Sequence, residues 1–482
     1  MEGPSRVFSR ILICARGEIA LRIIRACKEL GVSTVVACSE ADKDAIYLRF
    51  ADETICIGPA PSEQSYLNIP AIISAAEVTD VEAIHPGYGF LSEVSRFAEV
   101  CRSCNIEFIG PSAEAMSKMG DKVEARQIAM AAGAPVVPGS KGAVDDGDQA
   151  VAIAHEVGYP VLVKAGLGGG GRGMRVAHND MSLLNCFAVA QSEAEAAFGS
   201  KAVYIEKYVS GARHVEIQLL GDHHGNVIHL GDRDCSLQRR HQKLIEEAPC
   251  PAIDDELRQE LGQAAIAIAQ AVHYYGAGTV EFLVDGNGRF YFIEMNCRIQ
   301  VEHPVTEMVT GVDILREQLR IASGERLSLR QADVRISGVA IECRINAEDP
   351  VSFQPAPGTI TQYYAPGGPG VRVDSHAHAG SRVSPQYDSL IGKLIVHRRN
   401  RREAITCMQR ALEEYVIEGI KTTIPLYLDI FGHSAFLSGR VDTKFVEDVL
   451  DNGGFPSSRE DGETEPDPGR AHDPSTGRTR NG

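Results

Sequence analysis

The stretch RFYFIEMNCRIQVE, residues 289–302, decides how the centre of this chain folds. From Glu294 onward, polar residues occupy every second position and apolar residues fill the positions between them. A β-strand sends alternate side chains to opposite faces, so an extended chain gathers the polar groups on one face. These groups are Glu294, Asn296, Arg298, Gln300 and Glu302. A solvated strand face shows the same alternation, so this pattern alone leaves both interpretations open.

The residues before this stretch predict its partner strand. The segment GTVEFLV, residues 278–284, has strand composition, and DGNG, residues 285–288, is typical of a tight turn. We therefore expect an antiparallel hairpin in which Val284 faces Arg289 and Glu281 faces Phe292. That register places Glu281 one diagonal step from Glu294, at roughly 7 Å or less between Cβ atoms.

Two carboxylates this close to each other favour a bound cation. Glu281 and Glu294 would repel unless a metal ion or a proton lay between them, and Asn296 supplies a further oxygen. An oxygen-only set of ligands favours Mg²⁺ or Mn²⁺ over Zn²⁺. Arg298 and Gln300 donate hydrogen bonds, so the same face is expected to handle an anion at its other end.

Composition limits the class of protein. The chain has 482 residues, 44% of them hydrophobic and 23% charged, as expected of a soluble protein with two to four domains. The net charge of −17 argues against binding nucleic acid, and no segment is long and apolar enough to span a membrane. The apolar run near the start is too short for a signal peptide, and the 12 scattered cysteines suggest a reducing compartment, so we expect a cytoplasmic protein.

The order of elements predicts several α/β units. Residues 10–16 have the composition of a buried strand, residues 17–30 of a helix that ends at Gly31, and residues 33–39 of a second strand. This β-α-β unit predicts an open parallel sheet, and it lacks a dinucleotide-binding GxGxxG turn. We expect an N-terminal α/β domain, a central domain with a mobile lid, a C-terminal mixed α/β domain and a disordered tail. Their predicted ranges are 1–118, 119–333 with the lid at about 135–207, 334–447 and 455–482.

A glycine-rich segment, AGLGGGGRG at residues 165–173, lies between two strand-like segments. Its glycines match the spacing of a dinucleotide fingerprint, but no helix follows, and no Gly-Lys-Ser/Thr marks a Walker loop. A flexible hairpin loop whose backbone N–H groups fold over phosphates fits the context, and a plain linker is the alternative. Lys164, Arg172 and Lys122 favour phosphate.

The glycine-rich lid, the lysines before it and the Glu plus Glu-x-Asn hairpin resemble the ATP-grasp superfamily. Within that superfamily, the chain from about residue 10 to 447 resembles biotin carboxylases. The motifs that carry this resemblance are AIHPGYGFLSE (83–93), RHVEIQ (213–218), DCSLQRRHQK (234–243), MNCRIQVEHPVTE (295–307) and ECRINAED (342–349).

The resemblance implies site residues, each at the position that matches a motif. For ATP they are Lys122, Lys164, Gly168, Gly169, Gly170, Gly171, Glu206, Lys207, Tyr208, Val209, His214, Gln238, His241 and Leu283, together with Glu281 and Glu294. The implied metal ligands, for two Mg²⁺ or Mn²⁺ sites, are Glu281, Glu294 and Asn296. The implied bicarbonate pocket consists of Lys243, Arg298, Gln300 and the backbone of Val301. Glu302 would be the base that deprotonates bicarbonate, Arg344 would stabilise the biotin enolate, and Tyr88 would contact the ureido ring.

The implied reaction is the ATP-dependent carboxylation of biotin by bicarbonate through carboxyphosphate. This is the first half-reaction of acetyl-CoA carboxylase or a related acyl-CoA carboxylase, which connects it with lipid metabolism. No AMKM-like biotin attachment site occurs, so we expect the biotin carboxyl carrier protein and the carboxyltransferase to be separate polypeptides. The resemblance also implies a homodimer. It leaves open whether the final acceptor is an acyl-CoA, pyruvate or another oxo acid.

Some alternatives remain at this stage. Another ATP-grasp ligase is disfavoured because Glu302 and Arg344 occur together, and a non-catalytic assembly component would have lost charged site residues. Without the resemblance, Arg344 could form a structural ion pair with Glu342 or Glu348, Lys243 could belong to a solvated run of charges, and His214 and His241 could be ordinary surface or interface histidines. The chain departs from the family's usual residues at Ala15, Leu167 and Cys297, and we expect Cys297 to be a packing change.

Overall fold

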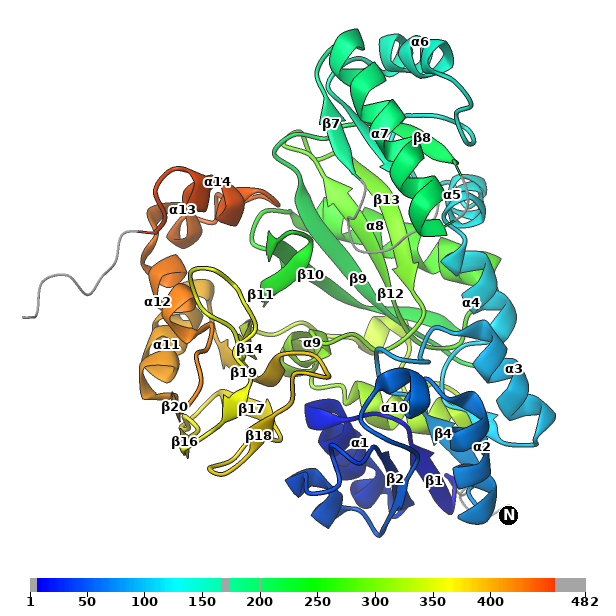
Figure 1. Cartoon of the computed structure of the whole chain (residues 1–482), viewed down its shortest axis with the longest axis vertical. Helices are drawn as coiled ribbons and strands as arrows, with labels where there is room; N and C mark the ends of the chain where they lie inside the picture. Colours follow the sequence, from blue (N-terminus) through cyan, green and yellow to red (C-terminus); the bar gives the residue numbers. More distant parts are fainter. Residues whose placement is uncertain (1–6, 166–173, 199–200, 456–482) are drawn as a thin grey trace, which may run out of the picture.

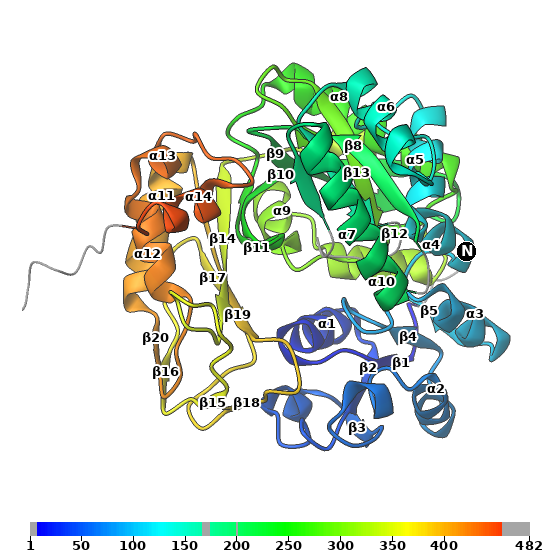
Figure 2. The ribbon, with the colours of Figure 1, turned by 45° about the horizontal axis from the view of Figure 1, so that its top comes forward.

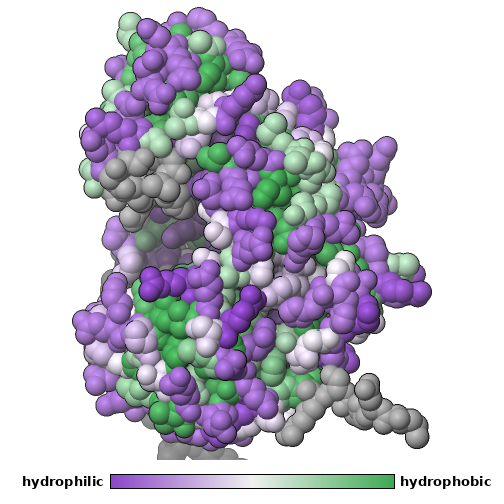
Figure 3. All heavy atoms as spheres, turned by 90° about the vertical axis from the view of Figure 1, so that its right-hand side faces the viewer, coloured by the Kyte–Doolittle hydropathy of each residue, from purple (hydrophilic) through white to green (hydrophobic). Residues whose placement is uncertain are grey.

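The computed structural model describes residues 7–165, 174–198 and 201–455, and the statements below refer to these residues. Figures 1 and 2 show the N-terminal part, the long central sheet with a smaller sheet at one end, and the C-terminal helices arranged around a common centre. Within the described ranges, no helix combines the length and the apolar character needed to cross a membrane. The view in Figure 3 shows a largely hydrophilic surface with apolar side chains in small groups.

The N-terminal part is an open parallel sheet with strand order β3-β2-β1-β4-β5, as predicted. The first unit consists of β1 (Arg10–Ile13), α1 (Gly17–Leu30) and β2 (Ser33–Cys38), so the first strand ends three residues earlier than expected. Gly31 ends α1 in the left-handed conformation, with φ 71°. The remaining elements are η1 (Ile46–Phe50), β3 (Glu53–Cys56), η2 (Ser62–Gln64), α2 (Ile69–Val78), β4 (Ala83–His85), α3 (Ser95–Ser103), β5 (Glu107–Phe108) and α4 (Ala113–Gly120).

A small antiparallel sheet, β7-β6-β8, forms its own layer with two helices. Its elements, and the helix before them, are α5 (Lys122–Ala131), α6 (Gly147–Val157), β6 (Val161–Ala165), β7 (Arg175–Ala177), α7 (Asp180–Phe198) and β8 (Val203–Lys207). Buried side chains such as Val161, Val163 and Ile205 form a separate apolar core there. The strands on either side of the glycine-rich segment pair with each other as predicted, and residues 166–173 themselves lie outside the described residues.

The largest sheet has eight strands in the order β13-β12-β9-β10-β11-β14-β19-β17. Their bounds are β9 (Arg213–Gly221), β10 (Val227–Arg239), β11 (Gln242–Ala248), β12 (Gly276–Val284), β13 (Phe290–Asn296), β14 (Val339–Asn346), β17 (Val371–Ser375) and β19 (Leu390–Arg398). The helices between these strands are α8 (Asp255–Ala271), α9 (His303–Thr310) and α10 (Ile314–Ala322), followed by η3 (Gln331–Asp333). The sheet is continuous from β11 to β14, so strands from residues 213–296 and 339–398 share one hydrogen-bonded surface.

The C-terminal part packs helices on the far end of this sheet around a second core that includes Leu394, Met408 and Tyr427. Its remaining elements are β15 (Gly358–Thr359), β16 (Gln362–Tyr364), β18 (Arg382–Val383), α11 (Arg401–Glu414), β20 (Val416–Glu418), α12 (Ile424–Gly432), α13 (Ser434–Leu437) and α14 (Phe445–Asp451). The predicted disordered tail falls almost wholly on residues 456–482, which lie outside the described residues.

Candidate active site

The hairpin of β12 and β13 brings the two predicted metal carboxylates together, although not in the expected register. Val284 pairs with Phe290, and Glu281 lies directly opposite Glu294. Both expected pairings are wrong: the turn places Val284 opposite Phe290 instead of Arg289, and the register shifts by one further residue between Glu281 and Phe282, so Glu281 does not face Phe292. Such a bulge adds one unpaired residue to a strand and redirects its side chains. Glu281 and Glu294 are therefore immediate cross-strand neighbours.

The polar face does not continue as one strand to Glu302. β13 ends at Asn296, and Glu302 is the residue that precedes the first turn of α9. The chain therefore bends between the two carboxylates, and it leaves the strand two residues before Arg298. We call residues 297–302 the 297–302 turn. It brings Glu302 back beside Lys243 and Glu281 on the neighbouring strands.

Glu302 lies between two cations and is 2% exposed. Lys243 Nζ donates to Glu302 Oε1 at 2.7 Å, and Arg344 donates to Oε2 at 2.9 Å. Burial by itself would raise the pKa of Glu302, but Lys243 and Arg344 outweigh it and hold this pKa below its usual value. The structural alternatives for these cations are wrong. Lys243 is buried rather than part of a solvated run, and the second partner of Arg344 is Glu246, at 2.6 Å.

Arg298 and Gln300 are held by residues outside the 297–302 turn. Glu93 accepts hydrogen bonds from Nε of Arg298 at 2.8 Å and from the backbone N–H of Cys297 at 2.9 Å. Arg233 is fully buried and donates to Oε1 of Gln300 at 2.7 Å. Since this contact fixes the orientation of the amide, the NH₂ group of Gln300 points at Glu281. Both side chains predicted to bind an anion therefore have fixed orientations.

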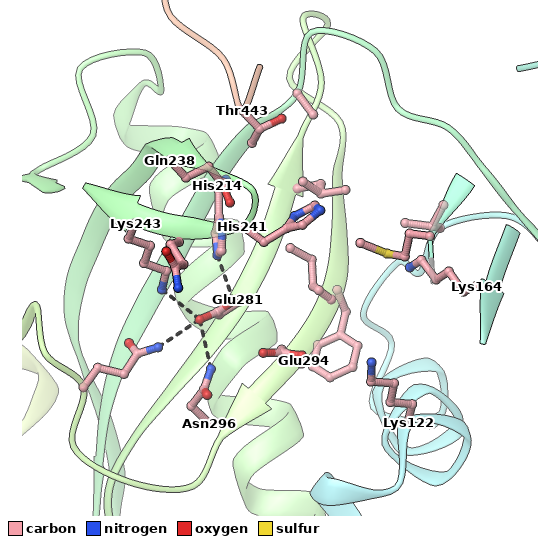
Figure 4. Close-up of a pocket in the computed structure, with 18 of the residues that line it drawn as sticks. Lys122, Lys164, His214, Gln238, His241, Lys243, Glu281, Glu294, Asn296 and Thr443 are labelled. Carbon is pink, nitrogen blue, oxygen red and sulfur yellow. Dashed lines mark hydrogen bonds and ion pairs between the residues drawn. The ribbon is translucent and has the colours of Figure 1, made fainter. Parts of the chain in front are cut away.

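Glu281 accepts three hydrogen bonds and lies beside His214 at the predicted metal-binding end. Lys243, Asn296 and Gln300 each donate to its Oε1 at 2.9 Å, and Nε2 of His214 lies 2.9 Å from its Oε2 (Figure 4). Burial would raise the pKa of Glu281, but Lys243 and His214 hold it well below its usual value. Burial and then the Glu281 charge raise the pKa of Glu294. The two carboxylates therefore differ: Glu281 already pairs with cations, whereas a nearby cation would favour the charged form of Glu294.

A two-residue turn places His241 over the site. β10 and β11 pair up to Arg239 and Gln242, and the two residues between them, Arg240 and His241, have φ of 49° and 64°. Positive φ at both central residues defines the type I′ hairpin, which usually has Asn or Gly there. The backbone N–H of Arg240 donates to Glu447 of α14 at 3.0 Å and thereby braces the turn. Burial lowers the pKa of His241, which favours the neutral imidazole.

Lys122 and Lys164 lie on the opposite side of the site from Lys243 (Figure 4). Lys122 begins α5, and Lys164 lies on β6, where it forms an ion pair with Glu206. The ammonium of Lys207 binds backbone oxygens. It donates to the backbone oxygens of Gly158 and Tyr159 at 2.9 and 2.8 Å. The strand predicted over residues 206–209 ends at Lys207, so Tyr208 and Val209 follow it.

Tyr88 follows β4 in a loop that packs closely on the start of α1. Gly87 has φ 63°, and a Cβ added to it would lie 2.7 Å from the Cβ of Ala15. The hydroxyl of Tyr88 donates to Oε1 of Glu18. Ala15 is buried in this contact, so the departure at this position affects packing beneath Tyr88. Cys297 is 3% exposed within the main core, which confirms that it is a packing residue.

The predicted residues that the structure describes all line one cavity of about 1510 Å³. They are Tyr88, Lys122, Lys164, Glu206, Lys207, Tyr208, Val209, His214, Gln238, His241, Lys243, Glu281, Leu283, Glu294, Asn296, Arg298, Gln300, Val301, Glu302 and Arg344. The other predicted residues, Gly168, Gly169, Gly170 and Gly171, lie outside the described residues.

Sequence reasoning missed the residues that hold the cations. Glu216 accepts from Lys243 at 2.6 Å and from Arg233 at 2.5 Å, and Glu246 accepts from Arg344. Glu216 carried a usable signal, because it alternates with His214 and Gln218 along β9. Arg233 and Glu246 carried none, since long buried strands do not reveal which polar residue faces which neighbour.

Family models match nearly the whole chain. The family models that match are described as carbamoyl-phosphate synthase L chain, ATP binding domain (residues 121–330), biotin carboxylase, N-terminal domain (residues 7–116) and biotin carboxylase C-terminal domain (residues 342–448). Biotin carboxylase 1 of Bacillus subtilis is 57% identical over 443 residues, which are 92% of this chain and 98% of the relative. One subunit of the pyruvate carboxylase of Methanothermobacter thermautotrophicus is 53% identical over 444 residues, 92% of this chain and 90% of the relative.

Solved structures agree with these matches. The biotin carboxylase of Campylobacter jejuni in a complex with a nucleotide superimposes with a TM-score of 0.89 at 51% identity and covers 92% of this chain and 100% of its own. The biotin carboxylase domain dimer of the Hydrogenobacter thermophilus 2-oxoglutarate carboxylase, in complex with MgADP, ADP and bicarbonate, has a TM-score of 0.87 at 49% identity, over 92% of this chain and 98% of its own. The chain therefore belongs to the biotin carboxylase family of ATP-grasp proteins and is an ATP-dependent ligase.

Proposed function

We propose that the protein uses ATP and bicarbonate to carboxylate biotin carried by a separate protein, with carboxyphosphate as the intermediate. The observation that carries this proposal is the placement of Glu302 between Lys243 and Arg344, with Arg298 nearby, in the cavity that Lys122 and Lys164 also line. Bicarbonate is a poor nucleophile, so it needs a base for its proton and cations for the resulting charge.

Glu302 is the proposed base, and its activation follows from its partners. Without ligand, Lys243 and Arg344 keep its pKa low, so it would be a weak base. When bicarbonate binds, Lys243 and Arg298 turn part of their charge toward the anion, and the pKa of Glu302 rises toward its usual value. Glu302 then takes the bicarbonate proton, and the freed oxygen attacks the γ-phosphorus of ATP with release of ADP. Gln300 and the backbone of Val301 complete the proposed bicarbonate pocket.

ATP is proposed to lie between the small sheet and the β12–β13 hairpin. Lys122 and Lys164 reach this space from one side, and His214, Gln238 and His241 reach it from the other (Figure 4). The lysines suit the phosphates, because ammonium groups disperse charge on a transferring phosphoryl group. Glu206, Tyr208, Val209 and Leu283 line the same cavity and are proposed to hold the nucleoside. Gly168 to Gly171 are proposed to cover the phosphates.

A divalent metal fits the Glu281 and Glu294 pair, with Asn296 beside it. The fit rests on two directly opposed carboxylates, Glu281 buried and Glu294 half-buried, and on the raised pKa of Glu294, which burial and the Glu281 charge cause. Mg²⁺ or Mn²⁺ bound there would neutralise charge on the phosphates of ATP. The relative described with MgADP supports this choice of metal, and a second metal between the same carboxylates is part of the proposal.

Biotin is proposed to approach from the side of Tyr88 and Arg344, where the guanidinium would stabilise the enolate oxygen. The partners are a biotin carboxyl carrier protein and a carboxyltransferase, and the relative described as a dimer supports a homodimer. The proposed setting is the cytoplasm, in the first half-reaction of acetyl-CoA carboxylase or a related acyl-CoA carboxylase. The similarity to part of a pyruvate carboxylase favours an oxo-acid carboxylase as the second candidate.

The test is ATP hydrolysis by the purified protein with and without bicarbonate and free biotin. We expect hydrolysis to depend on bicarbonate and to rise when biotin is added, with label from bicarbonate appearing in biotin. Hydrolysis that ignores both compounds would contradict the proposal. Identifying the carboxyltransferase that co-purifies with the chain, and assaying it with acetyl-CoA and with pyruvate, distinguishes the two candidate settings.

A further inference from the structure

Lys393 on β19 is a fully buried lysine that contacts the segment carrying Glu302 without lining the cavity. Its Nζ donates to the backbone oxygen of Val301 at 2.8 Å and lies 3.1 Å from Oε1 of Glu18. A buried ammonium group is unfavourable unless it is paired and hydrogen-bonded. The position of Lys393 is therefore tied to these two contacts.

The carbonyl of Val301 depends on this lysine because its neighbours are satisfied locally. The oxygen of Gln300 accepts from the backbone N–H of His303 at 3.3 Å, and that of Glu302 accepts from Val305 at 3.3 Å. Val301 instead receives its donor from a strand 92 residues further along the chain. Buried carbonyl groups are nearly always paired, so Lys393 fixes the backbone immediately before Glu302.

The other contact of Lys393 leads to Tyr88. Oε1 of Glu18, in the first turn of α1, accepts the hydroxyl of Tyr88 and also lies next to the Lys393 ammonium. Within the sheet, Lys393 is directly opposite Arg344 on β14 and Asp374 on β17. One buried side chain thus joins the α1 region, the 297–302 turn and the far strands of the sheet.

We propose that Lys393 is a positioning residue that fixes the 297–302 turn relative to Tyr88, and so aligns the bicarbonate and biotin sides of the cavity. This inference rests on the proposed function, because it takes Glu302 as the bicarbonate base and Tyr88 as a biotin contact. Carboxyphosphate decomposes in water, so biotin must already lie beside it when it forms. If the turn shifts relative to Tyr88, carboxyphosphate breaks down to CO₂ and phosphate, and the CO₂ escapes before biotin captures it.

The test is Lys393→Met, which keeps the length of the side chain and removes its charge and donors. We expect the KM for bicarbonate and the number of ATP molecules hydrolysed per biotin carboxylated each to rise about tenfold, since small misplacements of reacting groups are costly. The KM for ATP stays near that of the wild type. A purely structural role would reduce the amount of active enzyme without changing the ratio of ATP to carboxybiotin.

Arg401→Met is the control, because Arg401 forms a part-buried ion pair between distant elements, with Glu247 at 2.7 and 2.8 Å, and does not line the cavity. It is expected to keep the wild-type ratio. Glu18→Gln keeps the acceptor oxygen and removes its charge, so it should change the ratio in the same direction by a smaller factor. If Lys393→Met does not fold, the same measurements on Glu18→Gln test the proposal.

The possible outcomes separate this inference from the proposed function. If the wild-type protein carboxylates biotin, and the folded variants at Lys393 and Glu18 keep its ratio of ATP to carboxybiotin, the role of Lys393 is overturned while the proposed function stands. If the wild-type protein shows no bicarbonate-dependent hydrolysis of ATP, the proposed function fails, and the inference fails with it.

Discussion

The ammonium of Lys243 lies 2.7 Å from Oε1 of Glu302, so in the ligand-free protein the proposed base is neutralised by a group proposed to bind its substrate. Lys243 also contacts Glu216 at 2.6 Å and Glu281 at 2.9 Å. This cation therefore connects the bicarbonate end of the site with the metal end. Binding of bicarbonate and metal should redistribute one shared charge rather than fill two independent pockets.

Glu302→Gln removes the proposed base with almost no change of shape. We expect bicarbonate-dependent ATP hydrolysis to fall about 10²- to 10⁴-fold, the usual contribution of a general base. Binding of an ATP analogue, measured by calorimetry, should stay within a few-fold of wild type, because Glu302 is not among the residues proposed to bind ATP. The exposed Glu114→Gln serves as the control, and a Glu302→Gln enzyme with normal turnover would refute the assignment.

Glu294→Gln should weaken the metal site. The amide keeps one oxygen and loses the charge that balances the cation, so the Mg²⁺ concentration for half-maximal activity should rise about 10- to 100-fold. Because burial and Glu281 raise the pKa of Glu294, protons compete with the metal. The wild-type enzyme should therefore need more Mg²⁺ as the pH falls, and the variant should lose most of this dependence. A titration of Mg²⁺ at two pH values decides the point, and equal midpoints for both proteins would count against Glu294 as a ligand.

Glu342→Gln should change how stability depends on pH. Glu342 is fully buried opposite Glu246, and among the described residues neither of its carboxylate oxygens has a hydrogen-bond partner. Burial raises the pKa of Glu342 well above its usual value and that of Glu246 to about 7. An unfolded glutamate titrates near pH ~4.3, so the folded protein binds more protons above that value.

The stability associated with these two protons is complete below the unfolded pKa and is lost as the pH rises through the folded values. Wild type should therefore unfold at a lower urea concentration at pH 8.5 than at pH 6. Glu342→Gln cannot ionise, so its two midpoints should lie closer together. If the urea midpoints of wild type and Glu342→Gln shift equally between the two pH values, Glu342 does not contribute to the pH dependence of stability.

Arg233→Met tests the support behind the site. Arg233 is fully buried and donates to Glu216, Gln218, Thr279, Gln300 and Thr306. Its loss leaves the Glu216 charge with fewer partners, and breaking a buried pair in this way costs about 3–5 kcal/mol of unfolding free energy. Arg330→Met removes an exposed ion pair with Asp333 and should cost far less unfolding free energy, because solvent screens exposed pairs. Denaturant unfolding of both variants measures the difference, and equal losses would exclude a special role for Arg233.

Local sequence determined much of this protein. The β-α-β unit at residues 10–38, the end of α1 at Gly31 and the pairing of the strands around the glycine-rich segment follow from patterns that act over a few residues. The site residues were identified through motifs, and those that the structure describes line a single cavity. Such patterns consist of residue types and their spacing along the chain. They predict local structure because that structure depends on only a few neighbouring residues.

Tertiary structure decided the partners and the register. The extra residue of the bulge is Ile293 on the edge strand β13, opposite β12, which pairs with β9 without any shift, and no single segment contains this condition. The contacts of Glu302 with Lys243 and Arg344, of Arg233 with Gln300, and of Lys393 with Val301 join residues far apart in the chain. In the sequence these are polar residues on strands or turns. Only the packing of the sheet, which buries them where every charge needs a partner, fixes which of them meet.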